Sequence, residues 1–292
     1  MRIVVGIATT GRRAMLSHTL AHLARQTRRA DSILVCPARP DDFDEAAAAA
    51  LNLPIGSVSS QPGSCHQRNA IIDRAGDADL IVFFDDDFLP SDTFLAASEH
   101  LFTSQPDIAV ATGRVLADGA HGSGLTIEEG RDILANDTAA DAGASPTPTY
   151  NAYGCNMVFR MAAIAQGAVR FDEALPLYGW QEDVDFCRRL APQGRIVLSS
   201  SLRGVHLGTK NGRTSGLRFG YSQIANPIYL VGKGSVSHRW ALRLMARNMA
   251  ANMAGSLRPG GMVDRRGRLR GNVLAFRDLL LRRLSPGRIL DF

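Results

Sequence analysis

The sequence has 292 residues, of which 45% are hydrophobic and 21% are charged. This composition is typical of a soluble globular protein, and the length allows one large domain or a domain with an appendage. The net charge of +5 conceals an asymmetry, because residues 203–292 hold 17 Lys and Arg against 3 Asp and Glu, whereas residues 1–202 hold 16 against 25. An acidic body with a basic tail predicts that the tail meets an anionic surface.

The composition and spacing exclude several classes of protein. The cysteines show neither CxxC pairing nor zinc-like spacing, which indicates core thiols in a reducing compartment: Cys36, Cys65, Cys155 and Cys187. No apolar run reaches about 18 residues, so we expect no membrane-spanning helix. The residues after Met1 lack the pattern of a signal peptide, and no aromatic residues interleave with the basic ones as nucleic-acid binding would favour. The expected location is the cytoplasm.

The first part of the chain alternates predicted strands and helices. Apolar runs rich in β-branched and aromatic residues predict buried strands at 3–8, 32–36, 79–84 and 108–115. Helical spacing predicts helices around 16–24, 44–51 and 92–104, and another that ends near Gly76. This alternation predicts a parallel sheet with right-handed crossovers. GxGxxG and GxxxxGK[ST] are absent, which argues against a dinucleotide fold or a P-loop.

The pattern changes after residue 116. Residues 117–149 are rich in Gly, Ala, Asp, Thr and Pro with weak periodicity, and predict a long loop. We expect a helix that opens at Glu182, a strand at 196–198 and a Gly-containing loop at 205–213. Later amphipathic helical segments carry Arg on their polar side, at 224–231, 240–249 and 273–284, with a Gly/Arg loop at 258–261.

Three consecutive carboxylates, Asp85, Asp86 and Asp87, follow the strand at 79–84. Ser91 has the chemistry of a helix N-cap, so we expect this acidic cluster in a strand-to-helix loop. Ligands of open α/β sheets bind beyond the carboxyl ends of the strands. Because adjacent carboxylates repel one another and suit Mg²⁺ or Mn²⁺, the cluster predicts a metal-phosphate site. A solvated acidic turn is the alternative interpretation.

The order of the motifs resembles a family 2-type glycosyltransferase with the GT-A fold. The resemblance covers roughly residues 2–215 and rests on the Thr9-Thr10 loop, Pro62-Gly63 with Arg68-Asn69, Asp85-Asp86-Asp87 as a DxD motif, Gly154-Cys155-Asn156-Met157, Glu182-Asp183 and His206. It implies an α/β fold with a Rossmann-like mixed sheet flanked by helices over residues 1–217. Residues 218–292 would form a basic, amphipathic helical extension.

The resemblance also implies roles for particular residues. Asp87 and His206 would bind a divalent metal, Mn²⁺ or Mg²⁺, and Asp183 would be the catalytic base that deprotonates the acceptor hydroxyl. The nucleotide-sugar donor would be bound by Thr9, Asp42 (or its neighbour Asp41), Arg68, Asp85, Asp86, Lys210 and Arg213. The acceptor would be bound by Gly154, Asn156, Trp180 and Glu182.

Several of these residues have a simpler interpretation as well, and Trp180 could simply be half-buried. Glu182 and Asp183 could only complement the helix dipole, and His206 could be an ordinary loop histidine. Lys210 and Arg213 could belong to a solvated basic loop. The chain also departs from the family pattern, because Pro37-Ala38-Arg39-Pro40 replaces the usual Asp-Asn-Gly-Ser loop.

The implied function is an inverting, metal-dependent transfer of a sugar from a nucleotide-diphosphate sugar to a glycan or lipid-linked acceptor, in cell-surface polysaccharide biosynthesis. A sugar-phosphate nucleotidyltransferase is a second hypothesis, although its usual Gly-rich opening loop is absent. A scaffold of an assembly complex with little catalytic activity is a third. The basic tail either lies on anionic lipid at the inner face of the membrane or packs on the core as ordinary helices.

Overall fold

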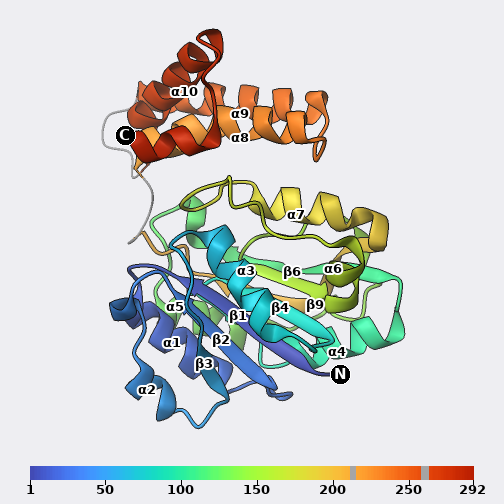
Figure 1. Cartoon of the computed structure of the whole chain (residues 1–292). Helices are drawn as coiled ribbons and strands as arrows, with labels where there is room; N and C mark the ends of the chain where they lie inside the picture. The colour runs from blue at the N-terminus through green and yellow to red at the C-terminus, as the bar shows by residue number, and fades with distance from the viewer. Residues whose placement is uncertain (211–214, 258–262) are drawn as a thin grey trace.

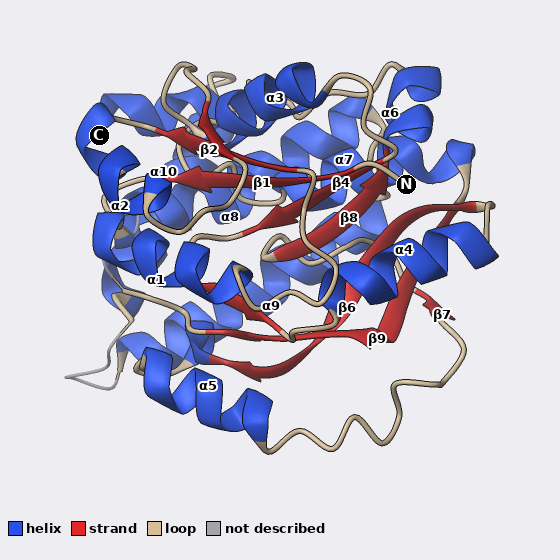
Figure 2. Cartoon of the chain, turned by 90° about the horizontal axis from the view of Figure 1, so that it is seen from below, coloured by secondary structure: helices blue, strands red, loops and turns tan. Residues whose placement is uncertain are grey.

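The computed structural model describes residues 1–210, 215–257 and 263–292, without the side chain of His121. Figures 1 and 2 show a twisted sheet with helices on both of its faces, which confirms the predicted mixed α/β fold. The strands are β1 (Ile3–Thr9), β2 (Ser32–Pro37), β3 (Ile55–Ser57), β4 (Leu80–Phe84), β5 (Phe88–Pro90), β6 (Ile108–Asp118), β7 (Thr147–Pro148), β8 (Asn156–Arg160) and β9 (Arg195–His206).

The described strands form one nine-stranded sheet in the order β3-β2-β1-β4-β8-β6-β9-β5, with β7 beside β9. The first four strands of this order are parallel, as the alternation of strands and helices predicted. Strand β8 is antiparallel to both of its neighbours, β4 and β6, and makes the sheet mixed. The carboxyl ends of β1 and β4 therefore lie near the centre of the sheet, where ligands of α/β folds bind.

Helices cover the two faces of the sheet through separate hydrophobic clusters. The helices are α1 (Arg13–Leu23), α2 (Glu45–Ala49), α3 (Ser64–Ala75), α4 (Phe94–Ser104), α5 (Ile127–Ala135), α6 (Met161–Gly167), α7 (Glu182–Leu190), α8 (Gly216–Lys233), α9 (His238–Ser256) and α10 (Arg265–Leu280). Side chains alternate along a strand. Thus Val82 and Phe84 of β4 pack with α1 and α4, whereas Ile81 and Phe83 pack with α3, α6 and α7.

Helices α8, α9 and α10 form a layer beyond α7 (Figure 1). They share a hydrophobic cluster that includes Tyr221, Met245 and Ala275. Helix α8 also contacts the body of the protein, because Lys233 pairs with Asp185 of α7 at 2.7 Å. These helices pack on one another and on the body, as one of the two interpretations of the tail expected. The division into units at residue 217 stays a prediction, and α8 begins at Gly216.

Two expectations about local structure were wrong. Residues 117–149 are not one long loop, because a capping box of Thr126 and Glu129 starts helix α5, which packs on β5 and β9. The acidic cluster does not lead into a helix, because Phe88–Pro90 forms strand β5, and the N-cap of α4 is Thr93 rather than Ser91.

Two further features concern the membrane and the cysteines. Within the described ranges, none of the helices has both the length and the apolar character needed to cross a membrane. All four cysteines are buried and free, in agreement with the core thiols that the spacing indicated. The predicted loop at 258–261 lies outside the described residues.

Two glycines provide a test of the packing between α8 and α10. A β-carbon at Gly271 would overlap the Leu217 carbonyl oxygen and lie 2.6 Å from the amide nitrogen of Tyr221, whereas one at Gly232 meets nothing within 4 Å. We expect Gly271→Ala to lower the free energy of unfolding by about 1–3 kcal/mol. The matched control Gly232→Ala should leave it unchanged or raise it by up to about 1 kcal/mol. Urea denaturation followed by circular dichroism measures both, and equal midpoints would contradict this packing.

Candidate functional site

The pairing of strand β9 brings the candidate site together. Phe88 of β5 lies opposite His206 of β9, so the imidazole stands beside Asp87, which precedes β5. On its other side β9 pairs with β6, and Asp118 is the partner of His206 in that register. Strand β6 has an irregularity between Val115 and Ala117, which pair with consecutive residues of β9. Such a bulge re-aims side chains, and here it places Asp118 opposite His206.

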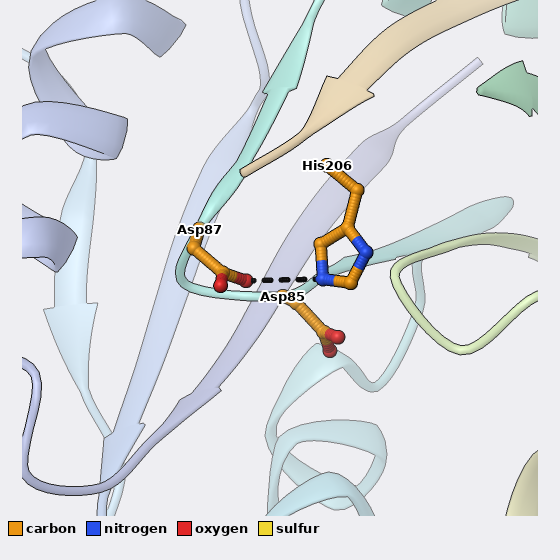
Figure 3. A group of neighbouring side chains, drawn as sticks. All are labelled: Asp85, Asp87 and His206. Carbon is orange, nitrogen blue, oxygen red and sulfur yellow. Dashed lines mark ion pairs between the residues drawn. The ribbon is translucent and has the colours of Figure 1, made fainter. Parts of the chain in front are cut away.

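The three carboxylates of the turn between β4 and β5 point in different directions. Asp85, Asp87 and His206 offer ligand atoms that all lie within 4.8 Å of one another. Figure 3 shows these side chains converging, with the ion pair between Asp87 and His206 marked. The Asp86 side chain instead binds Arg12 at 2.8 Å and Thr9 at 2.6 Å. The predicted DxD motif therefore separates into two converging acids and one that anchors the turn.

Asp87 and His206 form the buried part of this cluster. The Oδ1 atom of Asp87 lies 3.4 Å from Nε2 of His206 and has no hydrogen-bond donor, while its Oδ2 accepts a 2.7 Å hydrogen bond from the Thr209 amide. Burial opposes ionisation of Asp87, but the nearby charges of His206 and Arg12 and the hydrogen bond from the Thr209 amide outweigh it and lower the pKa of Asp87 to about 2. Burial likewise disfavours the imidazolium, yet Asp118 and Asp87 raise the pKa of His206 to about 10.

Asp118 and Tyr153 support His206, and sequence reasoning missed both. Nδ1 of His206 lies 2.9 Å from Oδ1 of Asp118, and the Tyr153 hydroxyl donates a 2.9 Å hydrogen bond to the other carboxylate oxygen. The Tyr153 ring also packs edge-on against the imidazole. Asp118 lies at the carboxyl end of a strand, a location that could have marked it, but its pairing with His206 depends on the register of β6 and β9.

The side chains of the predicted nucleotide-binding residues Thr9 and Asp42 both bind protein groups. Thr9 uses its hydroxyl to bind Asp86. Asp42 accepts hydrogen bonds from the amides of Gly11 at 2.8 Å and Arg39 at 3.1 Å, and thereby joins the two loops that follow β1 and β2. Both side chains are therefore engaged by protein groups at the carboxyl ends of β1 and β2.

Arg68 connects the acidic turn with helix α7. It is buried, lies 3.3 Å from Asp85 and forms an ion pair with Glu182. Its guanidinium also lies over the rings of Phe83 and Phe171, at 5.9 and 5.4 Å from their centroids. Sequence reasoning assigned Arg68 to the nucleotide, whereas the structure shows its charge balanced by two carboxylates.

Helix α7 begins with the predicted acidic pair. Gln181, just before the helix, has a φ of +77°, which is uncommon for a residue with a side chain. The helix start thus aims Glu182 inward at Arg68, while Asp183 stays half-buried. Oδ1 of Asp183 accepts a 2.8 Å hydrogen bond from the Val184 amide. Burial raises the pKa of Asp183 more than this hydrogen bond lowers it, so its carboxylate is a stronger base than an exposed one.

The remaining predicted residues have varied surroundings. A β-carbon at Gly154 would lie 3.7 Å from both Glu182 and Asp183, so Gly154 leaves space beside this acidic pair. The Asn156 amide is buried and hydrogen-bonded to Thr112 and Gly113 of β6.

Trp180 is half-buried and packs edge-on against Phe219 of α8. Lys210 donates to the carbonyl oxygens of Gly119 and Ala120, and Arg213 lies outside the described residues.

The geometry also corrects the interpretation of His206 as a loop residue, since it ends strand β9. Two carboxylates and one imidazole form a donor set that suits a divalent cation. The unpartnered Oδ1 of Asp87 faces Nε2 of His206, and without a metal a proton on the imidazole balances this carboxylate. A divalent cation would take the place of that proton, so Asp85, Asp87 and a neutral His206 could hold one, with Asp118 orienting the imidazole.

Comparisons with known proteins support the same fold. No family model matches the sequence, and no curated protein matches it. The mannosyltransferase PcManGT from Pyrobaculum calidifontis, solved with GDP-Man and Mn²⁺, is 15% identical, with a TM-score of 0.56 over 99% of this chain and 85% of its own. S. aureus TarS is 14% identical, with a TM-score of 0.53 over 79% of this chain. This chain spans only 40% of the TarS chain.

A third similar structure is the glucosyl-3-phosphoglycerate synthase from Mycobacterium tuberculosis, solved with Mn²⁺, UDP and glucosyl-3-phosphoglycerate. It is 16% identical, with a TM-score of 0.51 over 81% of each chain. Identities this low show a shared fold and not a shared substrate. The chain therefore has the GT-A fold that the order of its motifs implied.

Asp118 provides a test of the metal site. Partners that orient a ligating histidine commonly change metal affinity by about 10- to 100-fold. We therefore expect Asp118→Asn to weaken Mn²⁺ binding by about that factor, because the amide cannot fix the imidazole as a carboxylate does. Electron paramagnetic resonance titration with Mn²⁺ alone measures this effect. The matched control is Asp132→Asn, which changes an exposed carboxylate of α5. Equal Mn²⁺ affinities of wild type and Asp118→Asn would contradict the assigned role.

Proposed function

We propose that this protein is a glycosyltransferase, which moves a sugar from a nucleotide-diphosphate sugar to an acceptor hydroxyl. The observation that carries this proposal is the arrangement of two acidic groups on the GT-A sheet. One is the cluster of Asp85, Asp87 and His206, and the other is the acidic start of α7. Arg68 contacts a carboxylate of each group and joins them.

The cluster of Asp85, Asp87 and His206 would serve the donor. A divalent cation bound there would neutralise the negative charge that develops on the departing nucleoside diphosphate. The similar structures of PcManGT and the synthase contain GDP-Man with Mn²⁺ and UDP with Mn²⁺, respectively. We assign Thr9, Asp42 and Lys210 to the nucleotide side of the site, because Thr9 holds Asp86 of the acidic turn, Asp42 holds the Gly11 amide, and Lys210 lies in the segment after His206.

Asp183 is the residue that we assign as the base. Its carboxylate takes the proton of the acceptor hydroxyl while the oxygen forms a bond to the anomeric carbon, and the bond to the diphosphate breaks with its electron pair on the leaving group. Such a single displacement inverts the anomeric centre. Glu182 is less suited to this role because Arg68 holds it in a buried ion pair. Asp183 is half-buried and has a raised pKa.

The acceptor that we propose is the hydroxyl of a glycan or of a lipid-linked sugar, in the assembly of a cell-surface polysaccharide on the cytoplasmic side of the membrane. Gly154 leaves space beside Asp183 where a hydroxyl could approach. Trp180 lies three residues before Asp183 and presents a half-buried ring that suits contact with a sugar. The basic C-terminal helices agree with an acceptor that is anchored to anionic lipid.

Replacement of Asp183 by Asn tests this proposal, because the amide keeps the shape of the side chain but cannot accept the proton. We expect transfer to fall by about 10²- to 10⁴-fold, while affinity for the nucleoside diphosphate stays unchanged. The assay follows nucleoside diphosphate release from a panel of UDP- and GDP-sugars with Mn²⁺ and saccharide or polyprenyl-phosphate-sugar acceptors.

The matched control for this experiment is Glu128→Gln, which neutralises an exposed carboxylate in the first turn of α5. It should keep full activity. Transfer by Asp183→Asn at the wild-type rate would show that another group is the base. Absence of turnover by the wild type with every donor and acceptor would argue against the enzyme itself.

A further inference from the structure

Helix α9 has an outer face that is both apolar and basic. Its buried residues, Ala241, Met245 and Asn252, hold the opposite face against the protein. Asn252 donates hydrogen bonds to Gln223 of α8 at 2.7 Å and to Asn272 of α10 at 2.9 Å. At the start of the helix, Trp240 stacks on Tyr150 of the body. These contacts fix which side of α9 faces solvent.

The solvent side carries a stripe of large apolar side chains. Leu242, Met253 and Leu257 are 62%, 55% and 82% exposed. At about 100° per residue, these positions fall within about 60° of one another around the helix. Of the thirteen exposed large hydrophobic side chains in the described chain, eight lie between Leu242 and Leu290. The exposed large apolar side chains are therefore concentrated in the C-terminal helices, and those of α9 lie along one side of that helix.

A row of arginines runs beside the apolar stripe. Arg239, Arg243 and Arg247 recur every four residues, so they lie along one side of the helix, and all three are exposed. Among the described residues no ion pair joins them to a carboxylate. Helix α9 itself contains no Asp or Glu. The outer face of α9 therefore carries a positive charge that no acidic residue of the helix offsets.

We propose that this outer face of α9 binds the surface of an anionic membrane. An amphipathic helix lies in the membrane interface with apolar side chains among the acyl chains and cationic side chains at the headgroups. Leu242, Met253 and Leu257 supply the first group, and the arginine row supplies the second. This inference stands on surface residues alone and does not depend on the proposed chemistry.

Two other partners fit this face less well. A second copy of the chain would bring two arginine rows together, and their like charges would repel. A nucleic acid would use the arginines for its phosphates but would leave the Leu and Met stripe exposed. An anionic lipid surface can take up the Leu and Met side chains among its acyl chains and pair the arginines with its headgroups.

Sedimentation of the full chain with lipid vesicles tests the proposal. We expect binding to vesicles of 70% phosphatidylcholine and 30% phosphatidylglycerol, weak binding to pure phosphatidylcholine, and reduced binding in high salt. Replacing Arg239, Arg243 and Arg247 by Gln should weaken the partition coefficient on the order of a hundredfold. Replacing Leu242, Met253 and Leu257 by Gln should weaken it by at least about tenfold.

A matched control makes the same change of charge elsewhere. Arg29, Arg74 and Arg131 are also exposed, and their replacement by Gln should leave vesicle binding close to that of wild type. Circular dichroism and thermal midpoints check that each variant folds.

Failure of the wild type to bind anionic vesicles would overturn the proposal. So would full binding by the Leu/Met variant, which would point to charge alone and to a polyanion such as nucleic acid. Concentration-dependent dimers that the Leu/Met variant abolishes in gel filtration, without vesicle binding, would favour a second copy.

Discussion

The candidate site depends on the register of strand β9. Its last residue, His206, pairs with Phe88 of β5 on one side and with Asp118 of β6 on the other. Side chains alternate along a strand, so a shift of one residue would turn the imidazole to the opposite face of the sheet. The irregularity after Val115 in β6 shifts the pairing with β9 by one residue, so that Asp118 lies opposite His206. Backbone pairing therefore determines which side chains converge, and chemistry at the site follows from it.

The second constraint is the balance of charge in a buried space. Carboxylates removed from water need cationic or hydrogen-bonding partners. Arg12 balances Asp86, His206 balances Asp87, and Arg68 balances both Asp85 and Glu182. Arg68 thereby links the donor side of the proposed site to the helix that presents Asp183. A guanidinium with several donors in a planar fork suits this bridging position better than an ammonium would.

Some of this arrangement could be predicted from the sequence. Strand β4 and the acidic turn are local features, because an apolar run and three adjacent carboxylates need no distant partner to be recognised. Asp118, Tyr153 and Arg12 were missed because each acts through a contact with a residue 35 to 88 positions away in the sequence, which a local pattern does not reveal. Helix α5 was missed because Gly and Asp weaken its pattern, although Thr126 and Glu129 form a capping box. Composition alone favoured a loop there.

In the proposed function, Asp87 takes part in a metal-dependent site for a nucleoside diphosphate. Thermal unfolding of the purified chain in the presence of UDP or GDP, with and without Mn²⁺, tests it most directly, because a ligand that binds only the folded state raises the midpoint. We expect one nucleotide to raise the midpoint only when Mn²⁺ is present. We also expect Asp87→Ala to lose this increase relative to its own midpoint without ligand. An equal increase without metal or in Asp87→Ala, or no increase with either nucleotide, would contradict the claim.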